Sequence, residues 1–73
     1  MLKLVTLKIE HIDHRRTGAL ARQERLAVGM TLKQVGDLMV LTESYLSDLE
    51  RGNRNWDTAK VEQFNNALKG VRT

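Results

Sequence analysis

The feature that most constrains this chain is a pair of short helices predicted between residues 31 and 52. Thr31 and Gln34 stand three residues apart, the capping-box pattern in which each side chain bonds the other residue's backbone N–H at a helix start. The positions that follow repeat at the spacing of one helix face, and they are Leu32, Val35, Gly36 and Met39. The pattern predicts a helix of about two turns after Thr31.

A second helix is predicted to begin after Thr42, a residue type that caps helix N-termini. Its inward face is formed by Leu46, Leu49 and Glu50. Gly52 stands where a left-handed residue would end the helix. Two short helices joined by a tight connection form a helix-turn-helix.

The close of this motif is YLSDLERGNRNW at residues 45–56, and its entry is Gly29-Met30-Thr31. Both resemble the Cro and phage-repressor type of helix-turn-helix, the Xre family, and the resemblance extends over residues 17–68. It implies a mainly α fold, namely a small four-helix lambda-repressor-like bundle, and a transcriptional regulator that binds operator DNA. In this class the second motif helix enters the major groove while the first crosses the DNA backbone.

The composition is compatible with this resemblance and excludes several other classes. The 73 residues suffice for one domain with a small core, and the chain has no Cys for disulfides or thiolate zinc sites. A net charge of +3 suits nucleic acid, although 12 basic residues are balanced by 9 acidic ones. No apolar run approaches the roughly 18 residues of a membrane helix, and no signal-peptide pattern occurs. We therefore expect a cytoplasmic protein without a membrane partner.

Residues 1–10 alternate in hydropathy with a period of two, which predicts a strand over residues 2–9. A lone strand leaves backbone donors and acceptors unpaired, so the expected partner is a second copy of the chain. We interpret 1–12 as an N-terminal β-strand arm and 13–70 as the DNA-binding domain. The expected dimerisation residues are Leu2, Leu4, Val5, Leu7 and Ile9. The alternative is a disordered arm.

Two histidines bracket an acidic residue in His11-Ile12-Asp13-His14, which suggests a metal-site hypothesis. A zinc site needs about three or four converging ligands, and the sequence beyond this segment holds no further His or Cys. We interpret the segment as a solvated connector and expect neither a metal nor another cofactor.

The first helix is expected to begin at Asp13 or Thr17 and to end at Val28. Its predicted apolar stripe consists of Leu20, Ala21, Leu26 and Val28. The resemblance implies that Arg25, on an inward face, forms a structural ion pair with Glu50. Losing one partner of a buried pair leaves an uncompensated charge and costs about 3–5 kcal/mol.

The second motif helix is the predicted reading element. The resembled family uses the first turns of this helix on base edges, and with the leucines inward this implies base contacts for Glu43, Ser44, Ser47 and Asp48. Ser hydroxyls bond several bases, and a carboxylate accepts from the cytosine amino group. For Asp48 the alternative is a surface charge near Arg51. The resemblance further implies phosphate contacts at Lys33, Gln34, Thr42, Arg51, Asn53 and Arg54.

Two positions in the motif bear on its backbone. Gly36 lies in mid-helix, where Gly costs about 1 kcal/mol relative to Ala, so close packing of the two motif helices is its expected cause. Val40 stands where the family carries Gly in a left-handed conformation. A β-branched residue is costly there, so another turn geometry is expected.

The last helix is predicted to be capped by Asp57, with Trp56 packing on Val61 as a hydrophobic staple. Three residues recur at helical spacing and should close the core: Val61, Phe64 and Leu68. Only residues 71–73 follow the predicted end at Gly70, so no fifth helix is expected.

The sequence therefore predicts a regulator that occupies a palindromic operator as a homodimer, with double-stranded DNA as its partner. A phage-type repressor, a restriction-system controller and an antitoxin bound to a toxin are all compatible with it. The competing class is a protein-interaction module on the same scaffold, which the acidic residues of the reading helix favour. The sequence carries no nucleophile-elbow, phosphate-cradle or metal signature, so an enzyme is not expected.

Overall fold

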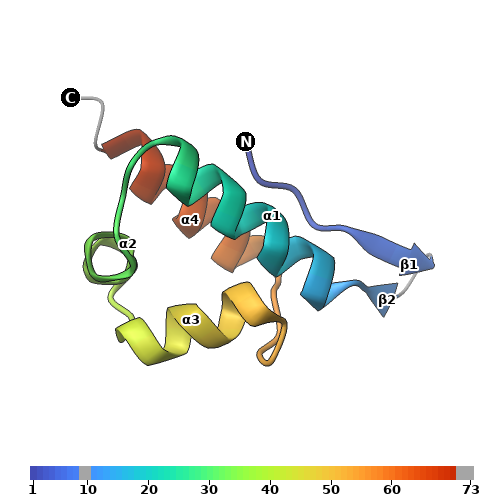
Figure 1. Ribbon diagram of the computed structural model, residues 1–73. Coiled ribbons are helices and arrows are strands. Elements are labelled where there is room, and N and C mark those ends of the chain that lie inside the picture. The colour runs from blue at the N-terminus through green and yellow to red at the C-terminus, as the bar shows by residue number, and fades with distance from the viewer. Residues whose placement is uncertain (9–10, 71–73) are drawn as a thin grey trace.

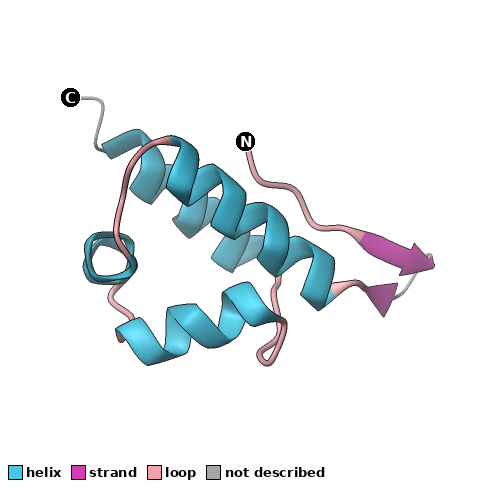
Figure 2. Cartoon of the chain, viewed as in Figure 1, coloured by secondary structure: helices cyan, strands magenta, loops and turns pink. Residues whose placement is uncertain are grey.

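Four helices follow a short hairpin in the computed structural model, which describes residues 1–8 and 11–70. The elements are β1 (Thr6–Lys8), β2 (His11–Ile12), α1 (His14–Ala27), α2 (Leu32–Met39), α3 (Glu43–Arg51) and α4 (Thr58–Gly70). Helix α1 packs on α3, α2 contacts α3 and α4, and the hairpin extends beyond the start of α1 (Figures 1 and 2). The predicted mainly α, four-helix architecture is confirmed.

Each helix begins at a polar side chain that accepts a hydrogen bond from its first turn. These caps are Asp13 for α1, Thr31 for α2, Thr42 for α3 and Asp57 for α4. At Thr31 the capping box is complete, because Oγ1 accepts from Gln34 N at 3.1 Å and Gln34 Oε1 accepts from Thr31 N at 2.9 Å. Bonds from the backbone N–H and side chain of Lys60 lower the pKa of the Asp57 carboxyl. Local sequence thus determines where the helices start.

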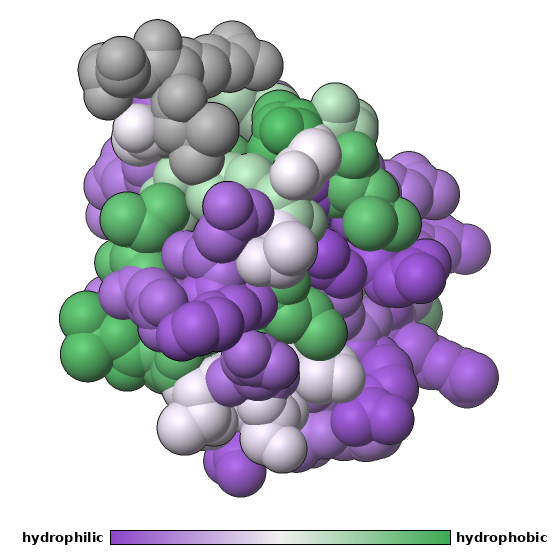
Figure 3. All heavy atoms as spheres, turned by 60° about the vertical axis from the view of Figure 1, so that its left-hand side comes forward, coloured by the Kyte–Doolittle hydropathy of each residue, from purple (hydrophilic) through white to green (hydrophobic). Residues whose placement is uncertain are grey.

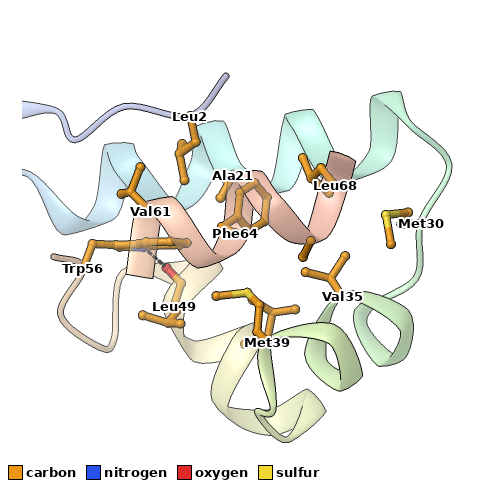
Figure 4. Close-up of a cluster of buried hydrophobic side chains, with 12 residues drawn as sticks. Leu2, Ala21, Met30, Val35, Met39, Leu49, Trp56, Val61, Phe64 and Leu68 are labelled. Carbon is orange, nitrogen blue, oxygen red and sulfur yellow. Dashed lines mark hydrogen bonds between the residues drawn. The ribbon is translucent and has the colours of Figure 1, made fainter. Parts of the chain in front are cut away.

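The core is closed by an aromatic pair between the α3–α4 loop and α4. The buried rings of Trp56 and Phe64 meet edge to face, with centroids 5.9 Å apart and planes at 85°. Trp56 Nε1 donates to Leu49 O at 2.9 Å, so its polar atom is satisfied (Figure 4). The other buried apolar residues are Leu2, Ala21, Met30, Val35, Met39, Leu46, Val61, Ala67 and Leu68. The core position predicted for Trp56 and the three apolar residues of α4 is confirmed.

Helices α1 and α3 approach so closely at Gly18 that no side chain fits between them. A Cβ at Gly18 would lie 2.2 Å from Leu49 O and 2.6 Å from Glu50 O. At Gly36 a Cβ would lie 2.9 Å from Leu41 O, in the turn after α2. The close neighbour of Gly36 is therefore the turn backbone, whereas the tight crossing of helices occurs at Gly18.

The N-terminal strand is shorter than predicted, and its partner lies within the same chain. β1 covers three residues instead of residues 2–9, and it pairs antiparallel with β2, with Thr6 opposite Ile12 and an irregular register toward Lys8. The segment read as a solvated connector therefore supplies the second strand. This corrects the argument that β1 must pair with another copy of the chain. Ile9 lies outside the described residues.

Leu2 belongs to the core of its own chain, where the sequence had suggested a dimer contact. Its side chain is 2% exposed, and its backbone is bonded twice to α4. Leu2 N donates to Asn65 Oδ1 at 2.8 Å, and Asn65 Nδ2 donates to Leu2 O at 3.0 Å. Leu4 packs partly against the same core, and Val5 is half-buried, whereas Leu7 is 69% exposed. The assignment of Leu2 to a dimer surface is corrected because folding buries it.

The apolar stripe of α1 is narrower than predicted. Leu20 and Leu26 are 39% and 51% exposed, so neither belongs to the buried face. That face consists of Thr17, Gly18, Ala21 and Arg25. The small residues bring α1 against α3 and leave the two leucines on the outer sides of the helix.

Val40 adopts the left-handed conformation that its β-branched side chain disfavours. Its φ is 58° and its ψ is 44°, and the side chain is 89% exposed. Hydrogen bonds from Val40 N to Asp37 O at 3.2 Å and from Leu41 N to Gly36 O at 2.8 Å end α2 in this geometry. The expectation of a different turn was wrong because these bonds close the helix regardless of the residue at the cap.

Candidate nucleic-acid interface

The inward face of α3 is fixed to the core. Leu46 and Leu49 are fully buried, and next to them Glu50 forms a bidentate ion pair with Arg25. Arg25 Nε lies 2.7 Å from Glu50 Oε2 and Arg25 Nη2 lies 3.1 Å from Oε1. Arg25 Nη1 donates to Met30 O at 2.8 Å, so the guanidinium also joins the α1–α2 loop. The structure brings together the two residues that the family resemblance had paired, and the buried pair orients α3.

Helix α3 lies along one edge of the molecule (Figure 1). Glu43 and Ser44 are exposed, and Ser47 and Asp48 are half-buried. Residues three or four apart share one helix face, so Ser47 lies beside both Glu43 and Ser44. A B-DNA major groove about 12 Å wide admits an α-helix, and hydroxyl and carboxylate groups can bond base edges there. The structure therefore groups the predicted base-contacting residues on one accessible surface.

The predicted phosphate-contacting residues lie at both ends of α3 and on α2. Thr42 caps the start of α3, Arg51 is its last residue, and the exposed Asn53 and Arg54 lie in the loop that follows. Because a helix rises about 1.5 Å per residue, Thr42 and Arg51 are separated by roughly 13 Å along the axis of α3. On α2, Lys33 Nζ lies 3.2 Å from Asp37 in an exposed pair, and the Gln34 carbonyl oxygen is occupied by the capping box.

Asp48 is the centre of a charged cluster that we call the Asp48 cluster, formed by Tyr45, Asp48, Arg51 and Arg54. Asp48 Oδ1 lies 3.1 Å from Arg51 Nη2, and Oδ2 lies 3.8 Å from Arg54 Nε. The Arg54 guanidinium carbon lies 4.1 Å from the centre of the Tyr45 ring, within the range of a cation–π contact. Sequence reasoning anticipated only the Arg51 neighbour, because Arg54 reaches the others through an irregular loop that no periodicity describes.

The two histidines occupy structural positions. His11 lies in β2, and His14 Nδ1 accepts from Trp56 N at 2.9 Å, which joins the start of α1 to the α3–α4 loop. Within residues 1–8 and 11–70, no three His, Cys, Asp or Glu side chains converge as metal ligands would. No sequence pattern predicts the bond to Trp56, because 42 positions separate the partners.

Apolar residues also reach the surface in separate places between polar ones, as Figure 3 shows for one face. Leu38 and Val40 are 54% and 89% exposed, beside a shallow groove between α2 and α4. In the part of the chain that the structure describes, none of the helices is long and apolar enough to cross a membrane.

Two capped helices joined by a short turn, with the second presenting a polar face, define a helix-turn-helix domain. Residues 16–70 match a family model described as a helix-turn-helix domain, and the chain belongs to this family. This match supports the assignment of the chain to DNA-binding proteins that regulate transcription. No curated protein sequence matches the chain significantly.

Among solved structures, the fold is similar to the restriction-modification controller protein C.AhdI from Aeromonas hydrophila. The TM-score is 0.72 at 30% sequence identity, and the match covers 78% of this chain and 86% of that one. The similarity therefore extends over most of both chains and includes more than the two motif helices.

Proposed function

We propose that the protein is a sequence-specific transcriptional regulator that occupies an operator as a dimer. One observation carries the proposal: α3 is held rigidly on one face by the buried Arg25–Glu50 pair and leaves Glu43, Ser44 and Ser47 accessible on the other. A site that reads bases needs side chains on a fixed element, because misplaced donors and acceptors lose their geometry.

Phosphate contacts would supply most of the affinity. Arg51 and Arg54 follow the reading surface, and Thr42 and Lys33 precede it, so a duplex lying along α3 meets polar or basic groups at both ends. Such contacts fix the register of a protein on DNA, whereas base contacts supply the sequence information. The net charge of +3 has the sign that a phosphate backbone requires.

Similarity to a restriction-modification controller favours a role in controlling such a system over a phage or antitoxin role. An operator-binding controller of this kind would act by occupancy, blocking or recruiting polymerase. Two copies related by a two-fold axis would place their α3 helices roughly 34 Å apart, one turn of duplex, on an approximately palindromic site. Because Leu2 is buried in its own chain, the surface that joins the copies includes other residues.

Selection of bound sequences from a random duplex pool tests the proposal directly. We expect an enriched, approximately palindromic site, a dimer on that site in analytical ultracentrifugation, and no enrichment from a pool incubated without protein. Failure to bind any duplex at low salt would refute DNA binding, and enrichment of a single half-site by a monomer would refute the dimer alone.

Two variants separate the predicted roles of the site residues. Arg54→Ala should weaken binding about equally on all sequences and flatten the dependence of log affinity on log salt, whose slope is about −0.9 per phosphate. Ser47→Ala should instead change preference at particular base pairs. Arg22→Ala, an exposed change on α1, is the control for loss of one positive charge.

A protein-interaction module is the second candidate, and the exposed Glu43 in the first turn of α3 favours it. A carboxylate there opposes the phosphate field that supplies most DNA affinity. Under this alternative Glu43→Gln would leave DNA unbound, whereas under the proposed function it alters affinity or base preference.

A further inference from the structure

The Asp48 cluster places an acidic group beside two of the arginines that would meet phosphate. The Asp48 side chain is 34% exposed, and those of Arg51 and Arg54 are 65% and 48% exposed. A carboxylate on the reading helix would normally repel DNA, yet this one already neutralises two cations of its own chain. Both arginines are accessible enough to exchange the carboxylate for another anion.

Phosphate oxygens and carboxylate oxygens bind a guanidinium through the same kind of charge-assisted hydrogen bond. The Arg51 N–H group that donates to Asp48 therefore cannot bond DNA at the same time, whereas Arg54, 3.8 Å from Asp48, is held there by charge alone. Arg54 would remain supported after leaving Asp48, because its guanidinium also lies 4.1 Å from the centre of the Tyr45 ring. The cluster thus offers two arrangements, one closed on Asp48 and one with the arginines on phosphate.

We infer that Asp48 is an affinity-setting residue, an internal competitor that holds Arg51 and Arg54 until phosphate replaces it. The inference rests on the proposed DNA-binding function and assigns to Asp48 a role other than base contact. A DNA complex that draws both arginines onto phosphate must break these internal pairs, so Asp48 lowers affinity and raises the protein concentration at which an operator fills. For a regulator, that concentration determines when control begins.

The test is the substitution Asp48→Asn, which keeps the side-chain shape and removes the charge. An exposed ion pair is worth a factor of roughly 1.4 to 5 in an equilibrium constant, and the factors for two pairs multiply, so losing both should tighten binding about 2- to 25-fold per protomer at low salt. The gain should shrink as salt rises, because both internal and phosphate pairs are screened over about 8 Å at physiological ionic strength.

Glu62→Gln is the matched control, because it removes one negative charge from an exposed position on α4, outside the ion pairs found in the described part of the chain. We expect it to change affinity less than about twofold. Thermal unfolding of each variant, followed by circular dichroism, verifies that the compared proteins are folded.

A second comparison establishes whether Asp48 acts through the arginines. Binding of a random-sequence duplex is measured by fluorescence anisotropy for the wild type, Asp48→Asn, Arg51→Ala with Arg54→Ala, and all three changes together. Without the arginines, the Asp48 change should have no effect beyond that of Glu62→Gln, since a double-mutant cycle isolates the coupling. If the triple variant binds too weakly to measure, each arginine is replaced alone, and the Asp48 gain should fall in both.

Three results overturn the inference. The first is an Asp48→Asn gain no larger than that of Glu62→Gln, and the second is a gain that persists without the arginines, which would mean direct repulsion of DNA. The third is an altered base preference without tighter binding to random duplex, which would mean base contact. In each case the wild type still binds DNA, so the proposed function stands. A wild-type protein that binds no duplex at low salt would overturn both the inference and the proposed function.

Discussion

The two ends of α3 are held in different ways, although a left-handed residue stands near each. At the C-terminal end Gly52 has φ 81°, and a Cβ there would lie 2.6 Å from the Arg15 Cα. Before the N-terminal end, Val40 has φ 58° with 89% of its side chain exposed. Position 52 requires glycine because of both its backbone conformation and its packing, whereas position 40 accommodates a valine in a strained conformation.

This difference shows that α3 is packed tightly against α1 at its C-terminal end and is only capped at its N-terminal end. The tight packing involves Gly18, the Arg25–Glu50 pair and Gly52, all at the contact between α1 and the last turns of α3. The proposed reading surface begins at the other end, where Thr42 supplies one capping bond. Substitutions should therefore decrease in effect from the tightly packed end to the reading end.

The largest loss of stability is expected for Gly18→Ala, which disrupts the contact between α1 and α3. The added Cβ would lie 2.2 Å from Leu49 O, and neither backbone can yield without separating α1 from α3. We expect a loss of about 4 kcal/mol or more, beyond the usual range for overpacking, measured by urea unfolding. Gly70→Ala, where a Cβ meets nothing within 4 Å, is the control and should change stability little. Equal losses of stability for Gly18→Ala and Gly70→Ala would contradict the steric explanation.

Next in size are Arg25→Ala and Glu50→Ala, each expected to cost about 3–5 kcal/mol because the remaining charge stays buried. The double variant should cost much less than the sum of the two, and a double-mutant cycle measures this coupling. Arg22→Ala, an exposed change on the same helix, should cost under about 0.5 kcal/mol. Additive losses would show that the pair contributes nothing as a pair.

A smaller effect is expected at the reading end, for Thr42→Ala. The hydroxyl accepts from Tyr45 N at 3.1 Å, and removing such a cap costs about 1 kcal/mol. Thr42→Ser retains the oxygen and should restore most of the stability in thermal unfolding. A loss as large as that from Arg25→Ala would contradict the contrast between the two ends.

The smallest effect, of opposite sign, is expected for Val40→Asn. Asn tolerates the left-handed conformation better than a β-branched residue, and little buried surface is lost, so stability should rise by about 0.5–1 kcal/mol. Val40→Ala keeps a Cβ but removes the branch, so its stability should lie between those of the wild type and Val40→Asn. Destabilisation by Asn would show that Val40 packs in a way its exposure does not indicate.

Much of the fold could be predicted because its signals are local. The caps at Thr31, Thr42 and Asp57 and the end of α3 at Gly52 depend on residues a few positions apart. The Arg25–Glu50 pair spans 25 positions and came from family resemblance instead. Local pattern alone could not have paired them, because periodicity indicates which face is buried and not what lies opposite.

The remaining features depend on contacts that no local pattern describes. The pairing of β1 with His11–Ile12 involves a two-residue strand, too short for alternation to reveal. At the candidate site, sequence reasoning identified the exposed positions of α3 but not the contact of Arg54 with Tyr45 and Asp48. Val40 shows the opposite case. A β-branched residue does disfavour the left-handed conformation, as the sequence indicated, but the hydrogen bonds that close α2 impose that conformation on it.

The attachment of Leu2 to Asn65 has a consequence for the order in which the protein folds. These partners are 63 positions apart, and the entropic cost of closing a loop rises by about 0.6 kcal/mol with each doubling of its length. On the ribosome Leu2 is synthesised long before α4, so its place in the core does not exist until the last helix has emerged. We therefore expect the Leu2 contact to form late in folding.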